Sequence, residues 1–366
     1  MIYKHLVTPL KITVIGAGAI GGLAGAYLTM AGEDVLLVDQ WTEHVEAMNE
    51  KGLEITGIRG SVHVKVKAAT PDQIKEPLEL AIISTKSQHT EEAMQEILAQ
   101  ITPKTTIVSL QNGFNVYVIA KLAPAGTDQV VGGVPNYGGA LVDPGHLEFA
   151  VEGPLHIGEL DGRITERVRR MQSLFSKLTE TIISDNIIGE LWAKQVYGCY
   201  LTMTALVDAP IAEVMASNRT RLMAGALVNE SLKVARIAGV SVKPMKNFFD
   251  PEIWSPSTPE ETSRFLEWME QAPGLGVRWK QRADSKLVKK ATGMLWDIVY
   301  RKCKSETRWT TGAVVDKARE LGVPVPANQK LVNMIYEIED GKRKFGWHNV
   351  DELEAYMESI GCVLPR

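Results

Sequence analysis

Apolar residues in the first half of the chain gather in short β-branched runs, and stretches with helical spacing separate these runs. Lys11–Ile15 and Asp34–Val38 are predicted strands, and Gly18–Ala31 between them is a predicted helix. The same pattern predicts a helix and four more strands at Trp41–Lys51, Leu80–Ser84, Thr106–Leu110, Val131–Val134 and Leu155–Ile157. Strands that alternate with helices are typical of βαβ units in a parallel sheet.

The pattern changes near the middle of the chain. Apolar residues recur at helical spacing from Asp185 to Val207 and from Ser217 to Gly239. More helices are predicted near Ser285–Lys304, Thr311–Leu321 and Asn328–Lys342. The segment Lys243–Val277 is rich in proline and aromatic residues and reads as irregular. We therefore predict an α/β domain at residues 1–184 and a mostly helical domain at residues 185–366.

A glycine-rich turn follows the first predicted strand. Its sequence has the spacing GxGxxG between a strand and a helix, which is typical of the Rossmann dinucleotide-binding turn. Glycines allow the tight bend and the close approach of a pyrophosphate, and the helix N-terminus adds a partial positive charge. Alone, such a turn can be purely structural. In this position it predicts a doubly wound Rossmann sheet and cofactor contacts from Gly16, Gly18, Ala19, Ile20 and Gly21.

The second predicted strand runs directly into Asp39, about twenty residues beyond the glycines. A carboxylate at this point binds the ribose 2′-hydroxyl of NAD and repels the 2′-phosphate of NADP. No lysine or arginine occurs in the next ten positions to hold that phosphate. Asp39 therefore predicts NAD rather than NADP, unless it is merely a solvated strand end.

Composition narrows the classes of protein. The chain has 366 residues, 45% hydrophobic and 23% charged, and a net charge of −4, which offers no basic surface for nucleic acid. The uncharged stretch Ile12–Gly32 is long enough for a membrane span, but its glycine rhythm fits the dinucleotide turn better. Three scattered cysteines and seven scattered histidines predict no disulfide framework and no metal site. A cytoplasmic protein is expected.

Several segments beyond the glycine turn resemble the ketopantoate reductase family, also called 2-dehydropantoate 2-reductases. Individually each motif is modest, but their order along nearly the whole chain is fairly specific. They are Ser84-Thr85-Lys86-Ser87-Gln88, Ser109-Leu110-Gln111-Asn112-Gly113, Trp192-Ala193-Lys194, Met294-Leu295-Trp296-Asp297, Ser305-Glu306 and Thr311-Gly312-Ala313. The resemblance implies a Rossmann domain and a C-terminal domain like that of 6-phosphogluconate dehydrogenase. It also implies a small-molecule substrate, catalysis between the domains and a homodimer.

The resemblance also implies roles for five residues. Lys194 would be the general acid in carbonyl reduction and the base in the reverse direction. Glu306 would bind the substrate hydroxyl or orient the lysine, and Asn112 would lie where nicotinamide meets substrate. Lys86 and Gln111 would belong to the cofactor site.

Chemistry supports a catalytic Lys194 independently of the family. Hydride transfer to a carbonyl leaves an alkoxide that needs a proton, and a positioned acid contributes ~10²–10⁴-fold. On a helix, Lys194 shares a face with Gly198, Leu201 and Thr202, as a lysine at the wall of a cleft would. The alternatives are a solvated helix lysine for Lys194 and a surface ion pair for Glu306.

The chain departs from the family at several substrate positions. Gly198 and Thr202 stand where the family has asparagines, Gly293 replaces a serine and Trp296 a glutamine. Losing hydrogen-bond partners should weaken a site built for a hydroxyl-bearing substrate, so ketopantoate itself is not expected. Arg308 is either a clamp for a carboxylate or a member of a surface ion pair.

These departures indicate a bulkier or more aromatic substrate. The aromatic segment Lys243–Val277 could form a lid over it, or its aromatics could pack a core. The prediction is an NAD(H)-dependent dehydrogenase for a 2-hydroxy acid or bulkier alcohol, with Lys194 as general acid and base. The alternatives are a true NADPH-dependent 2-dehydropantoate 2-reductase and a non-catalytic NAD-binding regulator.

Overall fold

The computed structural model describes residues 10–245, 249–271 and 292–365. The chain separates into two compact units. The first consists of Met1–Gln111 and Asn115–Ile187, and the second consists of Asn112–Phe114 and Ile188–Arg366. The change of hydrophobic pattern near residue 184 lies just before this division. Three residues from the middle of the first half, 112–114, thus belong to the second unit.

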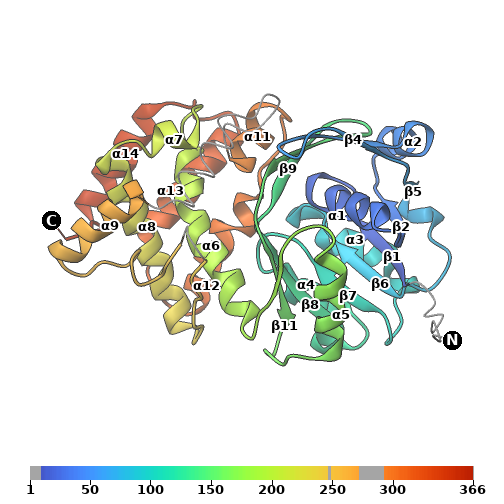
Figure 1. The fold of residues 1–366 in the computed structure, drawn as a ribbon. Coiled ribbons are helices and arrows are strands. Elements are labelled where there is room, and N and C mark those ends of the chain that lie inside the picture. Colours follow the sequence, from blue (N-terminus) through green and yellow to red (C-terminus); the bar gives the residue numbers. More distant parts are fainter. Residues whose placement is uncertain (1–9, 246–248, 272–291, 366) are drawn as a thin grey trace. The chain divides into compact units, whose positions relative to one another are not determined.

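An eight-stranded sheet forms the centre of the first unit, in the order β12-β11-β8-β7-β6-β1-β2-β5 (Figure 1). All neighbours are parallel except β8 and β11. The strands are β1 (Lys11–Ile15), β2 (Asp34–Val38), β5 (Lys67–Ala69), β6 (Leu80–Ile83), β7 (Thr106–Ser109), β8 (Val130–Pro135), β11 (Leu155–Glu159) and β12 (Thr181–Ile183). The central strands are almost wholly buried, which explains why they read as unbroken apolar runs. The predicted strands are confirmed within a residue or two.

Helices cover both faces of this sheet, as the doubly wound prediction requires. From β1 the chain proceeds through α1 to β2 on one side, and through β6 and α3 to β7 on the other. Because βα crossovers are right-handed, these helices lie on opposite faces. The first unit's helices are α1 (Ala19–Met30), α2 (Thr42–Lys51), α3 (Thr90–Ile97), α4 (Asn115–Leu122) and α5 (Glu166–Phe175), with short 3₁₀ turns at η1 (Pro71–Gln73), η2 (Ser87–His89), η3 (Leu98–Gln100) and η4 (Gly126–Gln129). The strand order reverses between β1 and β6, the point at which doubly wound sheets bind ligands.

A second, four-stranded sheet in the order β4-β3-β10-β9 was not predicted from the sequence. Its strands are β3 (Leu53–Gly57), β4 (Val62–Val64), β9 (Gly138–Asp143) and β10 (His146–Val151). Strands β9 and β10 contact α1, so this sheet covers the outer side of the helix that follows the glycine turn. Leu147 and Phe149 of β10 are fully buried in the same core as β1 and β2.

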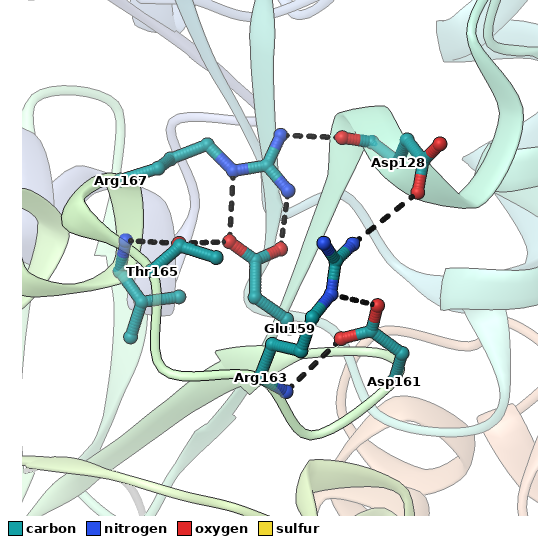
Figure 2. A network of polar contacts seen from close by, with 7 residues as sticks. Asp128, Glu159, Asp161, Arg163, Thr165 and Arg167 are labelled. Atoms are coloured by element: carbon teal, nitrogen blue, oxygen red, sulfur yellow. Dashed lines mark hydrogen bonds and ion pairs between the residues drawn. The ribbon is translucent and has the colours of Figure 1, made fainter.

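A buried carboxylate fastens the corner where β11 leads into α5 (Figure 2). The Glu159 side chain is 5% exposed and accepts hydrogen bonds from the Thr165 hydroxyl and from two nitrogens of Arg167. Thr165 also caps α5 by accepting from the amide of Val168. Arg167 donates in addition to the carbonyl of Asp128 at 2.6 Å, which links η4 to the same corner. Charge and caps thus fix three segments at one edge of the sheet.

The described part of the second unit is helical. Its helices are α6 (Ile187–Thr204), α7 (Ile211–Val214), α8 (Asn218–Ile237), α9 (Pro259–Gln271), α11 (Gly293–Val299), η5 (Glu306–Trp309), α12 (Thr311–Glu320), α13 (Pro326–Glu339) and α14 (Trp347–Ser359). Helix α8 packs against α9, α12 and α13, and α13 packs against α14. The prediction of an α/β domain followed by a helical domain is confirmed. None of the described helices has the length and hydrophobicity needed to cross a membrane.

The structure corrects the reading of Lys243–Val277 as irregular, because α9 lies within it. Thr262, Phe265 and Met269 are buried at helical spacing in α9, a period that the surrounding prolines obscure. Trp254 and Phe265 are fully buried and their ring centroids are 5.3 Å apart in the core of the second unit. These two aromatics therefore pack a core and do not form a lid. Residues 272–277 of this segment, and residues 285–291 of the helix predicted after it, lie outside the described residues.

Candidate functional site

The turn after β1 is held from several sides. Gly16 has a φ of +94°, and a Cβ there would lie 2.7 Å from the backbone nitrogen of Thr85, so only glycine fits. Its amide donates to the Val38 carbonyl at 2.8 Å, and its carbonyl accepts from the Ser84 hydroxyl at 2.9 Å. Residues from the ends of β2 and β6 therefore fix the first residue of the turn.

The other side of the turn presents unused donors. Among the described residues, none accepts a hydrogen bond from the backbone amides of Gly18, Ala19 or Ile20, and no side chain caps α1. A Cβ on Gly18 would meet nothing within 4 Å, so space is open beside the turn. Exposed amides at a helix N-terminus bind phosphate groups. The turn therefore fits the pyrophosphate of a dinucleotide.

Asp39 is more than a solvated strand end. One carboxylate oxygen accepts from the Ala17 amide at 2.9 Å, and the other accepts from the Trp41 amide at 3.0 Å. The half-buried carboxylate thus lies at the end of β2, directly beside the glycine turn. Each oxygen keeps a second lone pair, so the group can still accept from a ribose hydroxyl.

A residue that the sequence did not single out also contacts this turn. The ring of His44, in the first turn of α2, lies with Nε2 3.1 Å from the Ala17 carbonyl. The sequence did offer one sign of this contact: His44 follows Asp39 by five residues, which places it in the first turn of the helix after β2.

Gln111 lies at the end of β7 and is committed to protein contacts. Its amide nitrogen donates to the Thr85 carbonyl at 2.9 Å and to the Thr90 hydroxyl at 2.8 Å. With 4% of its surface exposed, it braces the loop after β6 and does not display an amide to a cofactor. Lys86 lies in this same loop, half-buried, at the start of η2.

Helix α6 of the second unit is buried on nearly all sides. From Leu191 to Thr204, only Lys194, Gly198 and Leu201 are half-exposed. Their spacing of four and three residues places them on one stripe. A Cβ on Gly198 would meet nothing within 4 Å, so the stripe borders open space one turn beyond the lysine. Lys194 is therefore not an ordinary solvated helix lysine.

Two other predicted catalytic residues meet in the second unit. The Asn112 side-chain amide donates to Glu306 Oε2 at 3.4 Å, although 194 residues separate them in sequence. Glu306 is 9% exposed and begins η5. Of its cationic neighbours in the sequence, Lys304 pairs with Asp340. Because Glu306 is buried, it does not lie at the surface as the ion-pair alternative supposed.

Thr202 lies behind the half-exposed stripe of α6. It is fully buried, and its hydroxyl lies 2.6 Å from that of Thr311 and donates to the Gly198 carbonyl at 3.1 Å. The sulfur of Met294 accepts from both Thr202, at 3.5 Å, and Thr307, at 3.3 Å. Thr202 therefore ties α6 to α11 and α12, and direct contact between its hydroxyl and a substrate is not supported.

The remaining predicted substrate residues lie on α11 and η5. Gly293 and Trp296 are half-exposed, and the Trp296 ring stacks on Tyr300 with centroids 4.2 Å apart. Arg308 is exposed and pairs with no carboxylate among the residues that the structure describes. Burial raises the pKa of Tyr336, and the nearby Arg308 charge partly opposes this rise. With the described residues, Arg308 thus forms no surface ion pair.

Other reactive groups do not add to the site. Burial raises the pKa of Cys199 to about 12, so its thiol stays protonated and unreactive. In the described part of the chain, no three His, Cys, Asp or Glu side chains gather in a way that could hold a metal ion.

Family models and curated relatives agree on the kind of protein. The model for ketopantoate reductase PanE/ApbA matches residues 12–162, and the model for its C-terminal part matches residues 186–339. A 2-dehydropantoate 2-reductase from Pyrococcus abyssi is 30% identical over 89% of this chain and 97% of the relative. One from Archaeoglobus fulgidus is 27% identical over 90% of this chain and 98% of the relative.

Solved structures share the fold. A D-mandelate dehydrogenase with NADH and anilino(oxo)acetate has a TM-score of 0.76 at 23% identity, covering 91% of this chain and 99% of its own. A ketopantoate reductase from Ralstonia eutropha has a TM-score of 0.73 at 24% identity, covering 92% and 100%. Fold, turn and relatives together define an NAD(P)-dependent oxidoreductase that acts on CH–OH groups and their carbonyl counterparts. The chain belongs to the ketopantoate reductase family.

Proposed function

We propose that this protein is an NAD(H)-dependent dehydrogenase for 2-hydroxy acids with a bulky, aromatic side chain. The proposal rests on two residues of η5. The buried Glu306 accepts a hydrogen bond from Asn112, and the exposed Arg308 has no carboxylate partner among the described residues. This short segment offers a polar group for a hydroxyl and, two residues later, a guanidinium for a carboxylate. A 2-hydroxy acid carries both groups on adjacent carbons.

In the reductive direction, Lys194 donates a proton to the oxygen of the substrate carbonyl. Its place on the half-exposed stripe of a buried helix supports this role, since an acid must be reachable yet held in position. Glu306, bonded to Asn112, accepts a hydrogen bond from the substrate hydroxyl or from the lysine. The bound nicotinamide would supply the hydride to the carbonyl carbon.

The substrate's side chain is accommodated by open space and an aromatic wall. The space beside Gly198 has no neighbour within 4 Å of a Cβ, and Trp296 is half-exposed on α11. A flat apolar ring gains from contact with another aromatic ring. The D-mandelate dehydrogenase of the same fold is a relative whose ligand, anilino(oxo)acetate, carries an aromatic ring beside an oxo acid.

NAD is the preferred cofactor in this proposal, and the turn residues Gly16 to Gly21 hold its pyrophosphate. Asp39 supports the preference because its carboxylate is fixed at the ribose end of the turn by two backbone amides. A 2′-phosphate there would face a negative charge, and the ten residues after Asp39 include no lysine or arginine to hold it, whereas the ribose 2′-hydroxyl can donate to the carboxylate.

Initial rates with two acids and two cofactors test the proposal. We expect kcat/KM for 2-oxo-2-phenylacetate with NADH to exceed that for ketopantoate with NADPH by at least about 100-fold, or roughly 2.7 kcal/mol. All the curated relatives named above are 2-dehydropantoate 2-reductases, so true ketopantoate reduction is the alternative. Strong NADPH-linked turnover of ketopantoate would establish that alternative instead.

Arg308→Ala tests the carboxylate clamp. We expect KM for 2-oxo-2-phenylacetate to rise about tenfold or more, because a charge-assisted bidentate bond is lost. The methyl ester of the same acid lacks the carboxylate charge and serves as the matched control substrate. An equal loss with acid and ester would show that Arg308 does not bind the carboxylate.

The assembly is proposed to be a homodimer, on the ground that a ketopantoate reductase from Staphylococcus aureus with this fold is described as dimeric. Light scattering coupled to size-exclusion chromatography would give the mass of the assembly directly. A mass of one chain at micromolar concentration would contradict it.

A further inference from the structure

We propose that His44 is a positioning residue for the dinucleotide, which aims the amide of Gly18 at the pyrophosphate. The inference rests on the proposed function, since it concerns the cofactor site of the same enzyme. His44 is fully buried, and both of its ring nitrogens contact backbone groups of the first unit. A buried histidine with two backbone partners has one fixed orientation.

The hydrogen bonds define the tautomer. The Gly145 amide donates to His44 Nδ1 at 2.9 Å, so Nδ1 must carry a lone pair. The proton is therefore on Nε2, which donates to the Ala17 carbonyl at 3.1 Å. The neutral ring satisfies both partners at once.

The far end of this bridge is itself fixed. Gly145 lies in the tight turn between β9 and β10 with a φ of +77°, and its carbonyl accepts from the Glu54 amide at 2.8 Å. A Cβ on Gly145 would lie 3.1 Å from that of Ala47 in α2, which leaves the turn little room to move. His44 thus links the glycine turn to the four-stranded sheet and holds the two in a fixed relative position.

Because the peptide unit is planar, the contact with His44 also fixes the direction of the Gly18 amide. The Ala17 carbonyl and the Gly18 amide belong to one trans peptide unit, so they point in opposite directions. Because His44 holds the carbonyl inward, the Gly18 amide faces outward to the open space beside the turn. Asp39 and Ser84 fix the preceding peptide unit in the same manner, through the Ala17 amide and the Gly16 carbonyl.

Without His44 the peptide between Ala17 and Gly18 could rotate. Its carbonyl oxygen would then face the pyrophosphate, where two negative groups repel and one donor is lost. The inference is that His44 acts on the affinity for the dinucleotide and leaves the chemical step unchanged.

Two conservative variants separate the two nitrogens of the ring. Glutamine places an amide nitrogen near the position of Nε2 and can still donate to the Ala17 carbonyl, whereas asparagine reaches only the position of Nδ1. We expect His44→Asn to raise the Kd for NADH about tenfold, with kcat at saturating NADH unchanged. His44→Gln should bind NADH within about threefold of the wild type.

His146→Asn is the matched control, since His146 is in the same unit, on β10, and contacts the Thr56 hydroxyl at 2.9 Å instead of the turn. It should leave the Kd unchanged. Binding of adenosine, which lacks the pyrophosphate, should be equal in the wild type and in His44→Asn. Wild-type affinity for NADH in a folded His44→Asn, or a kcat that falls as much as the affinity, would overturn the proposal.

If His44→Asn does not fold, ¹⁵N NMR of the His44 imidazole in the wild type still tests the proposal. The wild type should show a protonated Nε2 and an unprotonated Nδ1, and this tautomer should persist when NADH binds. The opposite tautomer would overturn the inference. Failure of the proposed function looks different, because the wild type itself would then bind NADPH in preference to NADH, or would bind neither.

Discussion

The two units of this chain show opposite ways of building part of an active site. In the first unit, the groups offered to a ligand are backbone amides. Side chains hold the carbonyls of Gly16 and Ala17, and the amides that follow, from Gly18 to Ile20, remain as hydrogen-bond donors. In the second unit, side chains carry the chemistry that we propose, and small or buried residues stand at the positions around Lys194. Gly198 leaves space where a side chain could stand, and Thr202 faces the interior.

This difference indicates where variation is tolerated. A backbone cradle binds any nicotinamide dinucleotide, so its geometry is tied to the cofactor and not to the substrate. Side chains on helices can be exchanged without altering the helices, and each exchange changes the space and polarity offered to the substrate. We therefore expect changes in the first unit to alter binding and stability, and changes in the second unit to alter turnover and selectivity.

Among the predicted variants, Lys194→Ala should have the largest effect, and the effect should be on turnover and not on cofactor binding. Loss of the proton donor should lower kcat by ~10²–10⁴-fold, or roughly 2.7–5.5 kcal/mol, because the alkoxide must then find its proton in water. The Kd for NADH, measured by fluorescence titration, should not change. Lys233→Ala removes an exposed lysine from α8 of the same unit and serves as the control. Full turnover in Lys194→Ala would show that Lys194 does not supply the proton.

Glu159→Gln tests the stability of the first unit. The Glu159 side chain is 5% exposed and its ion-pair partner Arg167 is 27% exposed, so removing the charge leaves a guanidinium largely unpaired. We expect the free energy of unfolding in urea to fall by about 2–3 kcal/mol. The turnover of the folded fraction should be unchanged. Asp161→Asn breaks an exposed pair with Arg163, also drawn in Figure 2, and should cost much less. Equal losses would contradict the assignment of Glu159 and Arg167 to a buried pair.

Gly198→Leu tests whether the open space in the second unit holds the substrate. The new side chain enters open space, so the protein should fold at least as stably as the wild type. Leucine is also a better helix former than glycine, by somewhat less than the ~0.8–1 kcal/mol that separates alanine from glycine. It should nevertheless lower kcat/KM for 2-oxo-2-phenylacetate about 10–200-fold, while turnover of pyruvate stays nearly unchanged. Gly198→Ala should give an intermediate loss. Unchanged kinetics with both acids would show that the space beside Gly198 does not hold the substrate.

The same contrast explains what could be predicted from the sequence. Strands β1 and β2, the helix between them and the turn at Gly16 follow from local periodicity and glycine spacing, because each is a local structure. Lys194 and Glu306 were proposed as catalytic residues from their motifs, and the structure joins Glu306 to Asn112. The four-stranded sheet was missed because β3 and β10 pair across about ninety residues, a contact that leaves no local signal.

Other misses have a common cause. Gln111 lies in the expected motif, yet its amide is used by Thr85 and Thr90. Thr202 has the right helical spacing, yet its rotamer directs the hydroxyl to Thr311. His44 belongs to no motif that we recognised; its spacing from Asp39 places it in α2, and its two backbone partners reveal its contact with the turn. Residue type and spacing predict which element a side chain belongs to, but the partners that satisfy its polar atoms depend on tertiary packing.

Glu352→Gln is the smallest expected change and contrasts the surface of the second unit with the buried corner of the first. Hydrogen bonds from Arg343, at 2.6 Å, and from Lys330, also at 2.6 Å, hold the pKa of Glu352 at about 2, below the ordinary 4.5. The side chain is 40% exposed, so solvent screening limits its contribution to less than about 1 kcal/mol.

The sign of this contribution fixes its pH dependence. Because the pKa is lower in the folded chain, the ion pair stabilises the fold above about pH 4.5 and loses its effect as the pH falls toward about 2. Urea titrations should therefore show a small deficit for Glu352→Gln at neutral pH, and the deficit should shrink as the buffer is made more acidic. A deficit that grows on acidification would mean that Glu352 is not held as a carboxylate by Arg343 and Lys330.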